Sequence, residues 1–164
     1  SLAVQVAALV AAIAICVGNG LFSGRLRDFT GYPAGAIAFM NQHRLQGRIF
    51  NELIWGSYIF WHAPDSKVFI DGRFEMVYPL DVQRDYLDFL SGGAGAARVL
   101  AAYPHDFVMV ETDAPPYRFM LRQAGWRLVY RDPVAALFAR ADSPAAHIAG
   151  VPVLRDEAPP SLFP

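Results

Sequence analysis

The feature that most constrains the fold is a short apolar run that ends abruptly in polar residues. Residues 67–70 are mostly β-branched or aromatic, and Asp71, Gly72 and Arg73 follow at once. This pattern is typical of a buried parallel strand that presents polar groups at its carboxyl end. In open α/β sheets, ligands bind in the crevice outside those carboxyl ends. The run therefore predicts an α/β sheet and indicates the edge where a site is expected, although it fixes no reaction.

Strand-like and helix-like segments alternate along most of the chain, which favours parallel βαβ units. The residues around 131–133 predict a turn between two closing strands. We therefore expect an α/β fold with a small mixed sheet, made of three central parallel strands plus a C-terminal antiparallel hairpin at the edge, with flanking helices. The expected strands are 48–53, 67–70, 106–111, 126–130 and 134–139, and the expected helices are 34–46, closed by Gly47, then 54–62, 79–90, 94–103 and 115–124.

The first part of the chain is strongly apolar. Residues 2–17 contain no charged side chain, and Gln5 is their only strongly polar one. The run is near the lower limit of the ~17–25 residues that a spanning helix needs. No basic stretch precedes it, as a signal peptide would require. The alternative is a buried core helix, which is less favoured because the run has no periodic polar face for solvent. We therefore expect residues 1–22 to be the end of a transmembrane helix, in a fragment that begins with Ser1.

Length and composition set further limits. The chain has 164 residues, enough for one domain with a real core. We expect a connector at 23–31, an α/β soluble domain at 32–140, and a Pro-rich tail, extended or disordered, at 141–164. The formal net charge of −1 gives no electrostatic reason to expect nucleic acid as a partner. The single cysteine, Cys16, excludes an intrachain disulfide.

The Asp71 and Arg73 pair has two interpretations. Arg73 could donate two hydrogen bonds to a hydroxyl-rich or phosphorylated ligand. Alternatively, the pair could form a buried salt bridge that fixes the loop after the strand, with Gly72 supplying a positive φ. The structural interpretation is favoured, because ion pairs of this kind are common at strand ends.

Polar residues also follow the two other expected parallel strands. Asn51 and Glu52 end the first of them, and Glu111 and Asp113 follow the third. If the strands are neighbours, Asn51, Asp71 and Glu111 lie along one edge of the sheet and could accept a ligand. Asn51 could instead cap the short helix that follows it, and the two acids could simply belong to solvated turns.

An aromatic cluster at 55–62 adds candidates for ligand contact, chiefly Trp55 and Tyr58. Flat rings suit the apolar faces of sugars, and Trp55 or Trp61 could equally anchor at a membrane interface. Core packing is the alternative, and it fits Phe60 best. The four histidines show no zinc spacing, and neither a glycine-rich phosphate loop nor a Gly-x-Ser-x-Gly elbow occurs. We expect no metal, no cofactor and no catalytic residue within this chain.

Several of these residues together resemble a known family. The region is similar to the C-terminal soluble domain of bacterial polytopic membrane proteins that resemble GT-C glycosyltransferases, which include the dolichyl-phosphate-mannose mannosyltransferases and aminoarabinose transferases. The likeness covers about residues 34–140. It is carried by Asn51, Trp55-Gly56-Ser57-Tyr58, Trp61, Pro64 and the residues 68–73, with 125–132 and 136–138 matching the terminal hairpin.

The resemblance implies a bacterial inner-membrane protein with many helices before Ser1, a periplasmic position for this domain, and a polyprenyl-phosphate-sugar donor. In such proteins the catalytic carboxylate lies in an early loop that this chain does not contain, so Asp71 is not implied to be catalytic. The expected function is a membrane-proximal accessory domain that contributes to substrate recognition, with the bilayer and the upstream protein as partners. Alternatives are a non-catalytic interaction or capping domain of an unrelated membrane protein and, least favoured, a free-standing hydrolase or nucleotide binder. Arg25 and Arg27 mildly favour a cytoplasmic side instead.

Overall fold

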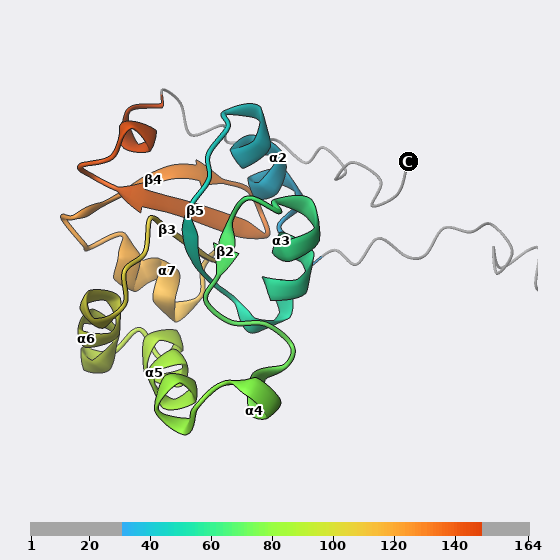
Figure 1. Ribbon diagram of the computed structural model, residues 1–164. Coiled ribbons are helices and arrows are strands. Elements are labelled where there is room, and N and C mark those ends of the chain that lie inside the picture. Colours follow the sequence, from blue (N-terminus) through green and yellow to red (C-terminus); the bar gives the residue numbers. More distant parts are fainter. Residues whose placement is uncertain (1–30, 149–164) are drawn as a thin grey trace, which may run out of the picture. The chain divides into compact units, whose positions relative to one another are not determined.

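A computed structural model describes residues 31–148 of the chain. They form a mixed α/β fold in which helices flank a five-stranded sheet (Figure 1). None of the helices within 31–148 is long and apolar enough to cross a membrane. The membrane helix expected at residues 1–22 and the tail beyond residue 148 lie outside the described residues.

The elements follow one another in the expected alternation. They are α2 (Ala34–Gln42), β1 (Arg48–Asn51), the 3₁₀ helix η1 (Leu53–Trp55), α3 (Gly56–His62), β2 (Lys67–Val68), α4 (Phe74–Val77), α5 (Leu80–Leu90), α6 (Ala94–Ala102), β3 (Phe107–Glu111), α7 (Pro115–Met120), β4 (Trp126–Arg131), β5 (Ala135–Arg140) and the 3₁₀ helix η2 (Pro144–His147).

The strand order is β2-β1-β3-β5-β4. β1 is parallel to both β2 and β3, whereas β5 is antiparallel to both β3 and β4. The three parallel strands are therefore neighbours, as expected, but β2 forms one edge and only β1 and β3 are central. The expectation that both hairpin strands lie at the edge is wrong for β5. Its first five residues are buried, three of them are alanines, and they pack in the apolar clusters on both faces of the sheet.

Two apolar clusters cover the two faces of the sheet. Ile49, Phe107 and Met109 pack on one face with α2 and α3. Phe50 and Val108, their neighbours along the strands, point to the other face and pack with α5, α6 and α7. Figure 1 shows these two sets of helices on opposite sides of the sheet. Because successive strand residues alternate between faces, β1 and β3 are buried on both sides.

Helix α2 ends earlier than predicted. Leu45 N–H donates to the Met40 carbonyl at 2.8 Å, and Arg44 N–H donates to the Asn41 carbonyl at 3.1 Å. This is the hydrogen-bond pattern of a Schellman motif, with the left-handed position taken by Arg44 at φ 53°. The prediction that the helix continues to Gln46 and is closed by Gly47 is therefore wrong.

Two short elements were not predicted. α4 is a single turn whose residues are all exposed or half-buried, so no apolar periodicity marks it. η2 lies within the region expected to be an extended or disordered tail. Ala145 and Ala146 of η2 are buried, and η2 packs on β4 and β5. The expectation for the tail is thus wrong for residues 144–147.

The two edges of the sheet differ in length. β2 pairs with β1 through only two residues. At the opposite edge, the pairing of β4 with β5 shifts register between Leu128 and Tyr130. This irregularity is a β-bulge, which bends the edge strand and increases its twist.

Candidate functional site

The carboxyl ends of β1, β2 and β3 lie along one edge of the sheet, because the three strands run parallel. This edge, called here the carboxyl edge, carries Asn51, Asp71 and Glu111, as predicted. It also carries Glu52.

Asn51 is used entirely within the protein. Its side chain is almost fully buried. The Nδ2 group donates to the carbonyls of Glu52 and Ile70, each at 2.8 Å, and Oδ1 accepts from Phe69 N–H at 3.0 Å. The side chain therefore joins the end of β1 to the segment after β2, and β2 stops at Val68 instead of Ile70. No side-chain hydrogen bond from a cap residue closes η1, so the helix-cap interpretation of Asn51 is wrong.

Asp71 and Arg73 form a two-pronged ion pair. Arg73 Nη2 lies 2.6 Å from Asp71 Oδ2, and Arg73 Nε lies 3.0 Å from Oδ1. The Arg73 backbone N–H donates to the same Oδ1 at 3.0 Å. The guanidinium lowers the pKa of Asp71 below its usual range, and the Tyr78 hydroxyl nearby lowers it further. The carboxylate therefore stays charged and fixes the position of the arginine.

The two partners differ in exposure. The side chain of Asp71 is 10% exposed, whereas that of Arg73 is 68% exposed. The pair is therefore a salt bridge with a buried acid and a solvent-facing base. Gly72 does not have the expected positive φ, because the glycines with a positive φ among the described residues are Gly47 and Gly92. A Cβ on Gly72 would meet no atom within 4 Å.

Gly56 is the glycine that the carboxyl edge requires. A Cβ built on it would overlap the Ile70 carbonyl oxygen and lie 2.6 Å from the Asp71 Cα. The first turn of α3 thus packs directly against the backbone that carries the Asp71–Arg73 pair. This contact positions the loop and explains why a glycine stands at the start of this helix.

Glu52 is the residue that sequence reasoning missed as a candidate. It is 9% exposed, and the Tyr86 hydroxyl from α5 donates to its Oε2 at 3.3 Å. That hydroxyl also accepts from Leu53 N–H at 2.8 Å. Burial, together with the neighbouring charge of Glu111, raises the pKa of Glu52 to about 7. Its place at the end of β1 was visible in the sequence, but its burial depends on α5, which is distant along the chain.

The acids after β3 are open to solvent. Glu111 and Asp113 are both exposed. Asp113, at φ 69°, lies 3.4 Å from Arg131 Nη2. Their arrangement fits the interpretation as a solvated turn, while Glu111 still acts electrostatically on Glu52.

The aromatic candidates of the 55–62 cluster differ in how far they are buried. Trp55 is fully buried, and its indole N–H donates to the Gly31 carbonyl at 2.6 Å. Tyr58 is half-buried and stacks on Tyr32 with ring centroids 5.1 Å apart. Trp61 is 77% exposed and Phe60 is 63% exposed. Core packing therefore holds for Trp55 and is wrong for Phe60.

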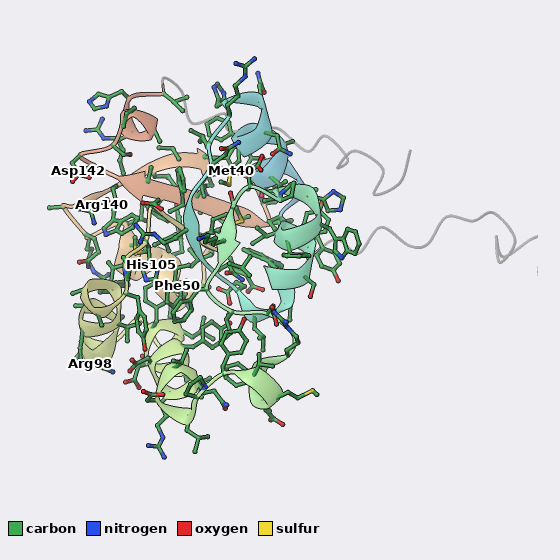
Figure 2. The ribbon with its side chains drawn as sticks, in the orientation of Figure 1. Met40, Phe50, Arg98, His105, Arg140 and Asp142 are labelled. Atoms are coloured by element: carbon green, nitrogen blue, oxygen red, sulfur yellow. The ribbon has the colours of Figure 1, made fainter. Side chains whose placement is uncertain are left out.

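A second buried titratable group lies at the other end of the parallel strands. His105 precedes β3 and is 4% exposed. Its ring lies edge-on to Phe50 at 5.0 Å (Figure 2). Burial lowers the pKa of His105 to about 4, so the ring is neutral near pH 7. Its Nε2 has no hydrogen-bond partner among the described residues.

The arrangement at the carboxyl edge suits binding better than covalent chemistry. Arg73 is held at one side by Asp71 and faces solvent at the other, which is the form in which arginine recognises phosphate or carboxylate groups. Within residues 31–148 no group of three or more His, Cys, Asp or Glu side chains could hold a metal ion. A pocket of about 210 Å³ lies elsewhere, between the end of α2 and the turn before β2.

Comparison with models of protein families, with curated proteins and with solved structures found no match.

Proposed function

We propose that this chain is the membrane-proximal accessory domain of a glycosyltransferase-like integral membrane protein of the bacterial inner membrane. In this proposal the domain lies on the periplasmic side and contributes to substrate recognition without supplying the catalytic acid. The bound substrate is a polyprenyl-phosphate-sugar, and residues 1–22 are the end of the preceding membrane helix.

The observation that carries the proposal is the geometry of Arg73. The guanidinium lies at the carboxyl edge, where open α/β sheets bind ligands. Its Nε and Nη2 are occupied by Asp71, and the side chain is nevertheless 68% exposed. An arginine that is oriented in advance in this way loses less freedom when it binds a phosphate.

The accessory role is supported by the state of the acids. Asp71 is fixed in its pair with Arg73, and Glu52 is buried under Tyr86. Neither is presented to a substrate as a free carboxylate. The family resemblance of residues 34–140 agrees with a recognition role, and the apolar run of residues 2–17 agrees with attachment to a membrane.

The test measures binding of a polyprenyl phosphate to the full chain in detergent micelles. We expect Arg73→Ala to weaken binding by about tenfold or more, since a charge-assisted hydrogen bond to phosphate is lost. Arg73→Lys should weaken binding less, because the charge remains while the fork geometry is lost. Arg84→Ala is the matched control, because Arg84 is exposed and makes no ion pair within the described residues.

Circular dichroism of each variant shows whether the fold is kept. Absence of polyprenyl phosphate binding by the unaltered chain, or an equal loss in Arg84→Ala, would rule the proposal out.

A second candidate function is a non-catalytic interaction or capping domain of a membrane protein of unrelated function. It is favoured by the exposed apolar side chains near the carboxyl edge, such as Trp61 and Met76. A chain that joins its membrane protein but ignores polyprenyl phosphate would favour this candidate.

A further inference from the structure

An apolar surface borders the carboxyl edge. Six large side chains that the fold leaves more than half exposed lie on η1, α3, α4 and the start of α5. The apolar edge surface, as we call it, consists of Ile54, Phe60, Trp61, Met76, Val77 and Leu80. These elements follow one another along the chain around β2, and exposed apolar residues gathered in this way mark contact with another protein or with a membrane.

The two halves of this surface are joined through the carboxyl edge. The backbone at Gly56 packs against Asp71, and Arg73 immediately precedes α4. Leu53, the neighbour of Ile54, donates its N–H to Tyr86. The Tyr86 ring lies 5.8 Å from that of Phe74 in α4. Figure 1 shows α3 and α4 on the β2 side of the sheet.

Core packing accounts for only one residue of α4, the half-buried Phe74, which packs against the same cluster as α5. Met76 is 87% exposed and Val77 is 54% exposed, and α4 contributes no buried residue to the described fold. Met76 and Val77 are shielded from water only if something other than residues 31–148 covers them.

The start of the described chain indicates what covers this surface. The Gly31 carbonyl is bonded to the Trp55 indole, and Tyr32 stacks on Tyr58 of α3. The chain therefore enters the domain at the helix that carries Phe60 and Trp61. If the apolar run ends at Phe22, the residues up to Gly31 can span no more than about 30 Å when fully extended. A membrane helix at 1–22 would thus hold α3 close to the bilayer.

We propose that the apolar edge surface lies in the interfacial region of the lipid bilayer. Exposed Trp and Phe side chains are the ones favoured at the level of the lipid headgroups, and Met and Leu insert more deeply. Arg73, between the two halves of the surface, then faces the lipid phosphates. This inference rests on the proposed function, because it requires residues 1–22 to be membrane-embedded.

The test uses the full chain in vesicles of phosphatidylethanolamine and phosphatidylglycerol. Single cysteines replace Trp61 or Met76 in a Cys16→Ser background and carry a nitroxide label. Leu121→Cys is the matched control, because Leu121 is itself 53% exposed but follows α7, which packs on β3 and α5 and carries no residue of the apolar edge surface. We expect labels at 61 and 76 to collide more with oxygen and several-fold less with a water-soluble nickel chelate than the label at 121.

The remaining outcomes each overturn the inference in a distinct way. If the chain floats with the vesicles but labels 61 and 76 behave like label 121, the chain is attached to the membrane, and the proposed contact of the apolar edge surface with lipid is wrong. Labels that are shielded from both reagents would show a protein segment, such as a second copy, over the surface. If the chain does not float with the vesicles, the membrane attachment in the proposed function fails as well.

Discussion

Gly56 shows how one missing side chain sets the position of the candidate site. Its Cα approaches the Ile70 and Asp71 backbone so closely that a methyl group has no space. The obstacle is main chain, which cannot rotate away as a flexible side chain can. The loop that holds the Asp71–Arg73 pair is therefore placed by this contact.

Gly56→Ala is expected to lower the free energy of unfolding by about 2 kcal/mol, in the range seen for overpacked sites. Chemical denaturation of the full chain measures this change. Gly72→Ala is the matched control, since a Cβ at that position meets nothing within 4 Å and should change stability by less than about 0.5 kcal/mol. Equal stability of the two variants would contradict the close contact.

At the scale of single elements, the end of α2 is the clearest departure from the sequence prediction. Glycine is the usual residue at the left-handed position of a Schellman motif, and the sequence therefore predicted that Gly47 closes the helix. Arg44 takes that position at φ 53° instead. A side chain with a Cβ is disfavoured in this conformation, so the helix end carries a local cost.

Arg44→Gly is accordingly expected to raise the free energy of unfolding by about 0.5–1 kcal/mol. A glycine two residues earlier should have the opposite effect on stability, because Gln42 is still helical and glycine is disfavoured there. Urea denaturation of Arg44→Gly and Gln42→Gly tests both signs. A loss of stability in Arg44→Gly would show that the arginine makes a compensating contact.

The strands were more accessible to sequence reasoning than the short helices. The apolar run at 67–70 correctly predicted a parallel strand that leads to Asp71. The strand is nevertheless a short one at the edge of the sheet, and its residues are exposed or half-buried instead of buried on both faces. The same reasoning placed the Asn51 and Asp71 ends at one edge. It could not show that the Asn51 side chain would bond to the Phe69 N–H and the Ile70 carbonyl beyond the end of the strand pairing, since that depends on the relative position of two strands. α4 is a single turn with no fully buried residue, so it leaves no apolar periodicity to detect.

For the molecule as a whole, two buried groups link stability to pH with opposite signs. Glu52 has an ordinary pKa of 4.5, which burial raises to about 7, so its protonated form is favoured by folding. Its contribution is fully present below pH 4.5 and is lost as the pH rises to about 7. His105 has an ordinary pKa of 6.5, which burial lowers to about 4. The histidine therefore destabilises the fold below pH 6.5, and stability rises as the pH increases from about 4.

The pKa values of Glu52 and His105 are displaced over a similar pH range but in opposite directions. Their contributions to the pH dependence of the free energy of unfolding are therefore expected to offset each other in the unaltered chain between about pH 4.5 and 6.5. Glu52→Gln should leave a stability that rises with pH, and His105→Gln should leave one that falls. Each slope corresponds to a change of about 3 kcal/mol over its window. Denaturation curves from pH 4 to pH 8 measure the profiles. Variant profiles parallel to that of the unaltered chain would show that these groups do not titrate as described.

The candidate site was predictable from sequence only in its location. The carboxyl edge follows from parallel topology, which local patterns support. The roles of its residues depend on contacts between distant segments. Tyr86 buries Glu52, and Arg73 turns out to be the exposed partner of its pair. Trp55 and Trp61 look alike in the sequence, yet Trp55 of η1 is buried in the core and Trp61 of α3 is exposed to solvent.

The two outer strands limit how this domain can associate with copies of itself. An open sheet edge is a template for fibril growth, and natural proteins protect such edges. Here β2 offers only two residues for pairing. At the other edge, the bulge in β4 interrupts a flat ladder, and Arg127 and Arg131 add charge. Many copies crowded together would therefore resist amyloid-like stacking.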